Sequence, residues 1–278
     1  MNLRKALDKA NKNRQENLQA ETEDSTGFKS ETTDPGVIDS TGWVSPVYSS
    51  SRNINIDKTT AIENRCVSLS QDASEIDFYK VIRTQILQKT QANDRNLIMI
   101  TSANPGEGKT VTAINLAVTF AKEFNNTSLL VDCDLKQQKI HQYLGLPGEK
   151  GLADYFIKGT PMDELIIWQG IEKLTLISGG AAVKDSSELL GSPKMKSIIK
   201  EMKNRYDNRY IFLDVPPVLN VSDAIAFAPL VDSIILVVQA GRTSVNDIKK
   251  ALALIPEEKF LSFVFNRNRR ANKVSVYN

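Results

Sequence analysis

A glycine-rich loop between an apolar run and a helical pattern constrains this chain more than any other feature. Residues 97–100 are apolar and predict a strand, residues 101–110 read TSANPGEGKT, and residues 111–121 have helical spacing. A strand, a glycine loop and a helix in this order form the context of a phosphate-binding loop. Glycines let backbone N–H groups surround an anion, and the next helix adds its positive N-terminal dipole. The chain is therefore predicted to bind a nucleoside triphosphate.

The residues that close this loop suit a triphosphate and its metal ion. Lys109 is long enough to reach the β- and γ-phosphates, and the hydroxyl group of Thr110 can bind Mg²⁺. Ala103 stands where the usual motif has its first glycine. The expected nucleotide-binding residues of the loop and of the start of the helix are Gly106, Glu107, Gly108, Lys109, Thr110 and Val111.

Acidic residues follow two further apolar runs. Residues 128–131 lead into Asp132 and Asp134, and residues 210–213 lead into Asp214. Ligands of an open parallel sheet bind beyond the carboxyl ends of its strands. We therefore expect these carboxylates to lie beside the glycine loop.

Each carboxylate has an expected role in phosphoryl transfer, which needs charge neutralisation by metal and an oriented nucleophile. Asp214 is expected to bind Mg²⁺ together with Thr110 and Asp132. Asp132 is also the candidate to accept the proton of an attacking hydroxyl group, or to orient water if the reaction is hydrolysis. Asp134 is expected to support the metal shell. With Lys109, these aspartates are the predicted catalytic residues.

From residue 74 onward, apolar runs alternate with helical patterns, as is typical of α/β folds. We expect a mostly parallel central sheet flanked by helices on both faces, as in P-loop NTPases. The expected strands lie near residues 97–101, 128–132, 173–177, 209–214, 232–238 and 260–265.

The segments SANPGEGKT, LLVDCDLK and FLDVPPVLNVSDA together carry a resemblance to a known family. They resemble the bacterial tyrosine kinases (BY-kinases) of polysaccharide export, which share the P-loop fold of the MinD/ParA ATPases. Those ATPases carry a signature lysine where this chain has Asn104, and Pro105 follows it as in the kinases. The resemblance spans roughly residues 70–270. It implies an ATP- and Mg²⁺-dependent enzyme that phosphorylates tyrosine.

The same resemblance implies how such a kinase is assembled and regulated. Its subunits would phosphorylate one another in trans within a homo-oligomer. Its partners would be a membrane chain-length determinant or co-polymerase, whose cytoplasmic tail completes the active site, and a cognate tyrosine phosphatase. The chain has no apolar run long enough to span a membrane. It would therefore be cytoplasmic and peripheral at the inner membrane through its partner.

Further residues take roles by this resemblance. Asn266 ends the last expected strand, where related folds place an asparagine against adenine. Asp77, Lys80 and Arg83 stand where the family has a Glu-x-x-Arg-x-x-Arg helix for ring assembly. Tyr277 is the expected phosphoacceptor, a single tyrosine where family tails carry a cluster.

The chain divides into an arm, a domain and a tail. Residues 1–20 have helical spacing and predict a short helix, which loosely resembles the N-terminal helices of exosortase-associated autokinases. Residues 21–70 are rich in small polar residues and predict a flexible linker, although residues 53–57 alternate like a short strand. Residues 71–268 form the expected kinase domain, and residues 269–278 the tail that carries the acceptor tyrosine.

Composition supports a folded domain and excludes several other classes. The chain is 41% hydrophobic and 24% charged, as globular proteins are. A net charge of +2 provides no general attraction to nucleic acid, so no such partner is expected. With 2 cysteines and 1 histidine, neither a disulfide framework nor a histidine metal site is expected.

Two other functions fit the same residues. A MinD/ParA-like ATPase switch would use the same metal site with water as the nucleophile; the single tail tyrosine favours it, and Asn104 argues against it. A nucleotide-binding scaffold of the export complex would bind ATP without kinase activity. The three differ in whether phosphate moves to protein, to water or not at all.

Overall fold

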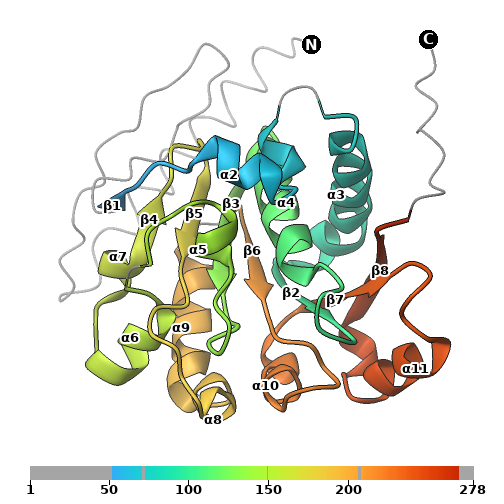
Figure 1. Ribbon diagram of the computed structural model, residues 1–278. Helices are drawn as coiled ribbons and strands as arrows, with labels where there is room; N and C mark the ends of the chain where they lie inside the picture. Colours follow the sequence, from blue (N-terminus) through green and yellow to red (C-terminus); the bar gives the residue numbers. More distant parts are fainter. Residues whose placement is uncertain (1–51, 71–72, 149, 206–207, 269–278) are drawn as a thin grey trace, which may run out of the picture. The chain divides into compact units, whose positions relative to one another are not determined.

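The computed structural model describes residues 52–70, 73–148, 150–205 and 208–268 (Figure 1). These residues form an 8-stranded sheet in the order β1-β4-β5-β3-β6-β2-β7-β8. Neighbouring strands are parallel except for the antiparallel pair β4 and β5. The strands are β1 (Arg52–Asn53), β2 (Leu97–Ser102), β3 (Thr127–Asp132), β4 (Ile166–Trp168), β5 (Leu174–Ile177), β6 (Arg209–Asp214), β7 (Ser233–Gln239) and β8 (Phe260–Asn266).

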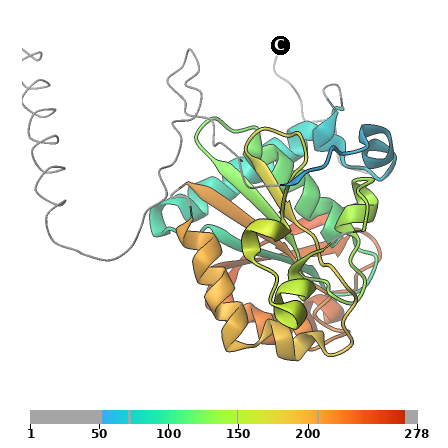
Figure 2. The same ribbon diagram turned by 90° about the vertical axis from the view of Figure 1, so that its left-hand side faces the viewer.

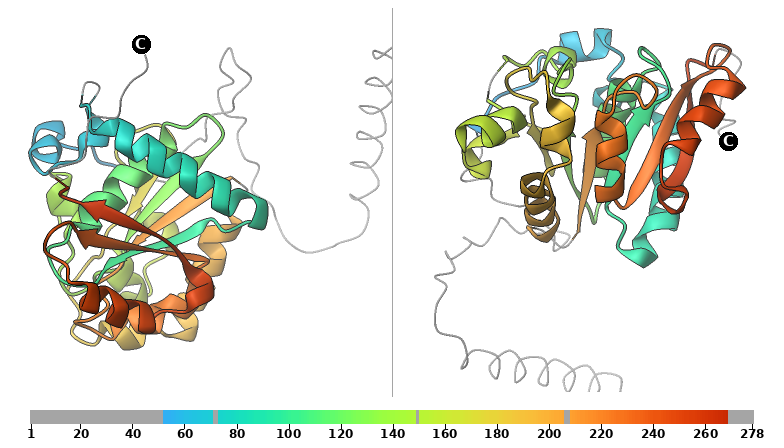
Figure 3. Two further views of the ribbon diagram at one scale, coloured as in Figure 1. Left: turned by 90° about the vertical axis from the view of Figure 1, so that its right-hand side faces the viewer. Right: turned by 90° about the horizontal axis from the view of Figure 1, so that it is seen from below.

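Helices cover both faces of this sheet. In the left view of Figure 3, α3 lies on one side of the strands and α11 on the other. The first face carries α2 (Lys58–Glu63), α3 (Ile76–Thr90), α4 (Lys109–Ala121) and α5 (Ile140–Tyr143). The second face carries α6 (Leu152–Lys158), α7 (Met162–Leu165), α8 (Ser186–Leu190), α9 (Pro193–Asn204), α10 (Asp223–Phe227) and α11 (Val245–Ala253). The 3₁₀ turns are η1 (Val67–Leu69), η2 (Gln91–Asn93), η3 (Ala228–Leu230) and η4 (Glu257–Lys259). The predicted α/β architecture is confirmed.

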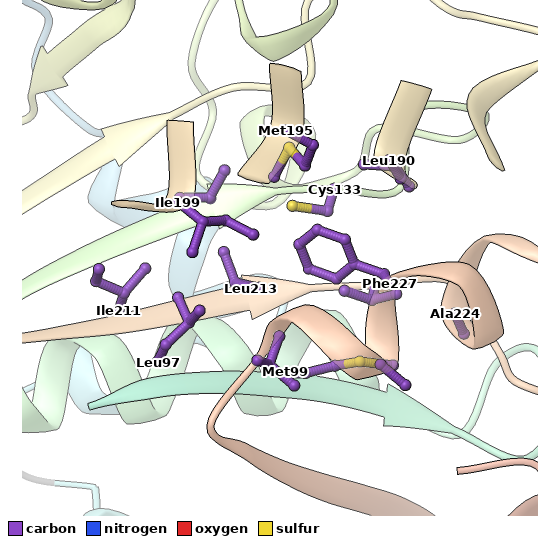
Figure 4. Packing of buried hydrophobic residues seen from close by; sticks show 14 of the residues in the cluster. Leu97, Met99, Cys133, Leu190, Met195, Ile199, Ile211, Leu213, Ala224 and Phe227 are labelled. Carbon is purple, nitrogen blue, oxygen red and sulfur yellow. The ribbon is translucent and has the colours of Figure 1, made fainter. Parts of the chain in front are cut away.

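Strand β2 shows why the sheet needs helices on both sides. Leu97 and Met99 point into one core, where Cys133 and Phe227 also pack (Figure 4). The intervening Ile98 belongs to the opposite core, because successive side chains of a strand face opposite ways. Every residue of β2 is buried, as expected for a central parallel strand. The glycine loop therefore leaves from a rigid strand at the middle of the sheet.

The predicted linker boundary at residue 70 is wrong, because residues 52–70 fold onto the domain. Strand β1 pairs with β4, and α2 begins at an N-cap, Asp57, whose side chain accepts the backbone N–H of Thr59 at 3.0 Å. Ala61 and Cys66 are fully buried in the core that also contains α4. Few large apolar residues suffice here, since they need only cover one corner of a core that α3, α4 and α5 already build. In Figures 1 and 2, β1 and α2 lie across the upper end of the domain.

Other predictions fall outside the part of the chain that the structure describes. These are the N-terminal helix over residues 1–20, the linker as far as residue 51, and the tail over residues 269–278 with Tyr277. Among the described helices, none combines the length and the apolar character needed to cross a membrane.

Candidate active site

The glycine loop joins β2 to α4 with two glycines in the left-handed region. Gly106 has φ 79° and Gly108 has φ 98°, values that favour glycine. A Cβ atom on Gly108 would lie 1.9 Å from Nδ2 of Asn266, so a larger residue does not fit there. Helix α4 begins at Lys109, directly after the loop. The N–H groups at the N-terminus of this helix therefore point toward the loop. This is the local geometry of a phosphate site.

Lys109 lies among the predicted carboxylates. Its Nζ atom is 2.9 Å from Oδ2 of Asp134 and 3.3 Å from Oδ1 of Asp214. The hydroxyl group of Thr110 donates to Oδ2 of Asp214 at 2.7 Å. Burial disfavours the charge of Lys109, but Asp214 and Asp134 outweigh it and raise the pKa of this lysine. The structure thus brings these four predicted residues together.

Asp132 lies behind this cluster, at the carboxyl end of β3. It pairs in register with Asp214 of β6 and is fully buried. Its two carboxylate oxygens accept the backbone N–H groups of Asp134 and Ile140, each at 3.1 Å. Burial, reinforced by the charge of Asp214, raises the pKa of Asp132 to about 8. Burial also raises the pKa of Asp214, although Lys109 opposes that shift.

The oxygen atoms at this site fit Mg²⁺. This ion takes oxygen ligands and usually binds through one or two protein groups plus substrate phosphates and water. The Thr110 hydroxyl and the Asp214 carboxylate, already in contact, form such a pair. Asp214 is the better placed carboxylate, because it contacts Thr110, whereas the two backbone hydrogen bonds of Asp132 come from the segment after β3. A metal contact of Asp132 stays a prediction.

Glu107 braces the loop. Its Oε2 atom accepts the N–H of Asn104 at 3.0 Å, and its Oε1 atom accepts the Thr243 hydroxyl at 2.5 Å. Its side chain is buried and turned into the protein. A contact of Glu107 with nucleotide would therefore come from its backbone, and that contact stays a prediction. Sequence reasoning missed Thr243, which lies far along the chain with no local motif.

Asn266 at the end of β8 also contacts the loop. Its Nδ2 atom donates to the backbone carbonyl of Glu107 at 2.8 Å, and its Oδ1 atom accepts the N–H of Arg267 at 2.9 Å. Asn266 lines the same cleft as the loop, but its amide is engaged within the protein. Its contact with adenine stays a prediction.

The cleft over the loop has a volume of about 200 Å³. The predicted residues that line it are Gly106, Gly108, Lys109, Thr110, Val111, Asp134 and Asn266. Sequence reasoning assigned no site role to four further lining residues: Arg65, Gln137, Lys139 and Tyr143. Gln137 and Lys139 closely follow Asp134, a signal that could have found them. Arg65 lies in the segment taken for a linker, where no motif marks it.

An ion pair with a buried carboxylate ties the loop after β3 to the helices of the second face. Nζ of Lys136 lies 3.0 Å from Oδ1 of Asp223, whose side chain is fully buried. The Ser186 hydroxyl hydrogen-bonds to the other oxygen of Asp223. Lys136 is thus directed to α8 and α10, and this network holds the loop that carries Asp134.

Helix α3 carries the residues expected at an oligomer interface. Asp77 and Lys80 form an exposed ion pair at 2.9 Å. Arg83 donates to the backbone carbonyl of Thr119 on α4 at 2.9 Å. Their role in assembly stays a prediction.

Comparison with known proteins agrees with this site. The family model described as AAA domain matches residues 95–260. The tyrosine-protein kinase YwqD of Bacillus subtilis is 32% identical over 201 residues, which cover 72% of this chain and 83% of that protein. The chain belongs to the bacterial tyrosine kinase family. The predicted family is confirmed.

Solved structures agree with this bacterial tyrosine kinase assignment. The kinase domain of VpsO is 29% identical with a TM-score of 0.62, covering 69% of this chain and 96% of that domain. The septum site-determining protein MinD of Pyrococcus horikoshii, complexed with Mg-ADP, is 24% identical with a TM-score of 0.52. The match covers 63% of this chain and 72% of the MinD chain. This similarity shows a shared fold and nothing more.

Proposed function

We propose that this bacterial tyrosine kinase transfers the γ-phosphoryl group of ATP to tyrosine, and that its subunits phosphorylate one another in trans. The observation that supports this most is the contact of Lys109 and Thr110 with the carboxylates at the ends of β3 and β6. Phosphoryl transfer depends chiefly on positioning and charge stabilisation, which this cluster supplies.

The proposed roles follow the contacts. Lys109 binds the β- and γ-phosphates, while Thr110 and Asp214 hold the metal. Mg²⁺, when bound with ATP, neutralises charge on the phosphates. Asp132 accepts the phenol proton, since tyrosine has a pKa of about 10 in water and needs a base. Asp134, which lines the cleft, supports the metal shell.

We propose a place for the enzyme in exopolysaccharide or capsule synthesis. Its partners would be a membrane chain-length determinant or co-polymerase, whose cytoplasmic tail activates it, and a cognate tyrosine phosphatase. It would act in the cytoplasm at the inner membrane as a homo-oligomer. Tyr277 would be the acceptor, and Asp77, Lys80 and Arg83 would contribute to assembly.

The test is autophosphorylation of the full chain with labelled ATP and Mg²⁺, alone and with the cytoplasmic tail of the partner. We expect label on tyrosine, lost in Lys109→Ala and lost or strongly reduced in Tyr277→Phe. Label that persists in Tyr277→Phe would move the acceptor to another tyrosine. Release of free phosphate without labelled protein would support the ATPase switch, and no transfer at all would support the scaffold.

The catalytic assignments need a second comparison. Asp132→Asn is expected to lower kcat at least about 100-fold while ATP still binds, because loss of a general base removes that much catalysis. Asp214→Asn should instead weaken Mg²⁺ binding and raise the Mg²⁺ concentration needed for half-maximal activity. If Asp132→Asn keeps full activity, the proton acceptor is another group.

A further inference from the structure

The segment over residues 57–68 is held firmly against the phosphate-loop helix α4. Asn115 of α4 is fully buried. Its Nδ2 atom donates to the backbone carbonyl of Arg65 at 3.0 Å, and its Oδ1 atom accepts the N–H of Ser68 at 2.8 Å. One turn further along α4, the hydroxyl groups of Thr119 and Ser68 hydrogen-bond at 2.9 Å. These bonds place Arg65 next to the helix that begins at Lys109.

The same segment also contacts α5, on the other side. The N–H of Asp57 donates to the carbonyl of Leu144 at 3.1 Å, and Nδ2 of Asn64 approaches the carbonyl of Tyr143 at 3.4 Å. In Figure 1 the segment crosses from the region of α5 to α4. Its Arg65 lines the cleft, although the segment lies outside residues 95–260 that the family model matches.

Arg65 has a backbone conformation that glycine would suit better. It follows α2 with φ 65°, and the N–H groups of Arg65 and Cys66 bond back to Ile62 and Ala61 at 2.9 Å each. This is the pattern that ends many helices, and the left-handed position is usually glycine. If this position served folding only, glycine would be more favourable there than arginine. Such positions are common at ligand sites, where the side chain serves binding.

The charge around Arg65 suits an anion. Arg65 lines the cleft together with Lys109, and within the described residues no carboxylate forms an ion pair with it. Asp134, the acidic residue that lines the cleft, forms its ion pair with Lys109. Lys139 and Arg267 add cationic groups to the lining. An exposed guanidinium beside a phosphate loop matches the geometry of phosphate oxygens.

We infer that Arg65 binds the triphosphate of ATP, so that the segment before the matched domain completes the nucleotide site. This rests on the proposed function only in taking ATP as the ligand. Charge-assisted hydrogen bonds of this kind change affinity by about ten-fold or more. Because glycine is the preferred residue at this backbone position, the binding role and the folding role of Arg65 predict opposite effects of one substitution.

The experiment is calorimetric titration of Mg²⁺-ATP into the full chain and into Arg65→Gly, with thermal unfolding of both. We expect Arg65→Gly to weaken ATP binding about ten-fold or more while its melting temperature stays unchanged or rises. Lys58→Ala, which removes an exposed charge of the same segment outside the cleft lining, should bind ATP as the wild type does. Unchanged affinity in Arg65→Gly would overturn the inference.

Two further ligands locate the contact. If Arg65 binds phosphate, the loss should appear with ADP and be absent with adenosine. An equal loss with adenosine would overturn the phosphate assignment. Binding is read without phosphoryl transfer, so a wild-type chain that binds ATP but labels no tyrosine would refute the proposed function and leave this inference standing.

Discussion

At the scale of single residues, the site is a cluster in which three aspartates surround one lysine. One lysine, Lys109, contacts Asp134 and Asp214, and Asp132 lies buried behind them. Burial raises the pKa of both Asp132 and Asp214. The two carboxylates therefore hold a proton to higher pH than an exposed aspartate does. This balance has a measurable effect on stability.

Without Mg²⁺, the free energy of unfolding should fall as pH rises. The pKa of Asp132 is about 8 in the folded chain against an ordinary value of 3.8, so the folded state binds more protons between these values. Its contribution is fully present below pH 3.8 and is lost by about pH 8, with a slope of up to about 1.4 kcal/mol per pH unit. Urea unfolding in EDTA from pH 5 to pH 9 measures it. Asp132→Asn should flatten the curve; an equally steep curve in that variant would contradict the assignment.

The bond between Glu107 and Thr243 should be needed to shape the glycine loop. Thr243→Val removes the hydroxyl that donates to Oε1 of Glu107 and accepts the N–H of Gln239. We expect the KM for ATP to rise about ten-fold with a smaller change in kcat, because loss of a bond to a charged group costs about 1.5–3 kcal/mol.

Thr243→Ser is the matched control, since it keeps the hydroxyl group. Its KM should stay within about two-fold of the wild type, because the hydrogen bond is preserved. If serine and valine behave alike, the hydroxyl does not position the loop, and packing of the threonine methyl group explains the effect.

At the scale of elements, the carboxyl ends of the strands are held in place by contacts between distant segments. Asp223 is buried at the start of α10 and is paired with Lys136, from the loop after β3. Ser186 at the start of α8 hydrogen-bonds to the same carboxylate. A buried carboxylate that loses its cation is strongly destabilising, so this pair matters more than a surface pair.

Lys136→Met should lower the free energy of unfolding by about 2 kcal/mol, a value reduced for the partial exposure of Lys136. Lys150→Met is the control, because Lys150 and Glu164 form a pair that is more than half exposed on both sides. That variant should change stability by less than about 1 kcal/mol. Denaturant unfolding of both variants provides the comparison, and similar losses would show that the Asp223 pair has no special role.

At the scale of the whole molecule, the domain extends beyond the region that carries the family motifs. Residues 52–70 bury Ala61 and Cys66 against a shared core and provide hydrogen-bond partners for Asn115. Burial raises the pKa of the Cys66 thiol to about 12, so it stays protonated near neutral pH. This corner is part of the folded unit.

A chain that begins at residue 71 should be less stable than one that begins at residue 52. Removing the segment exposes apolar side chains of α4 and α5 and leaves polar groups of Asn115 unpaired. We expect a loss of at least about 3 kcal/mol from these effects together. Thermal unfolding of the two truncated chains measures the difference. Equal melting temperatures would show that the segment is not part of the cooperative domain.

The sequence alone determined what local chemistry can determine. Gly106, Gly108, Lys109 and Thr110 are adjacent in the chain, so the phosphate loop could be read from their order. The aspartates were placed near it because parallel strands share one carboxyl edge. Strand order, with β2 between β6 and β7, and the inward turn of Glu107 were not predictable.

Only the tertiary structure decided which distant residues complete the site. Thr243 and Glu107 form a hydrogen bond although they lie 136 residues apart in the sequence, and Asn115 and Arg65 do so at a separation of 50 residues. No sequence motif indicates either contact. The polar residues around Ala61 and Cys66 also suggested a linker. Composition gives the number of apolar residues in a segment, but it does not show whether those few residues pack against a core that other elements build. A local motif follows from neighbours along the chain, whereas a binding wall follows from packing, which depends on the whole fold.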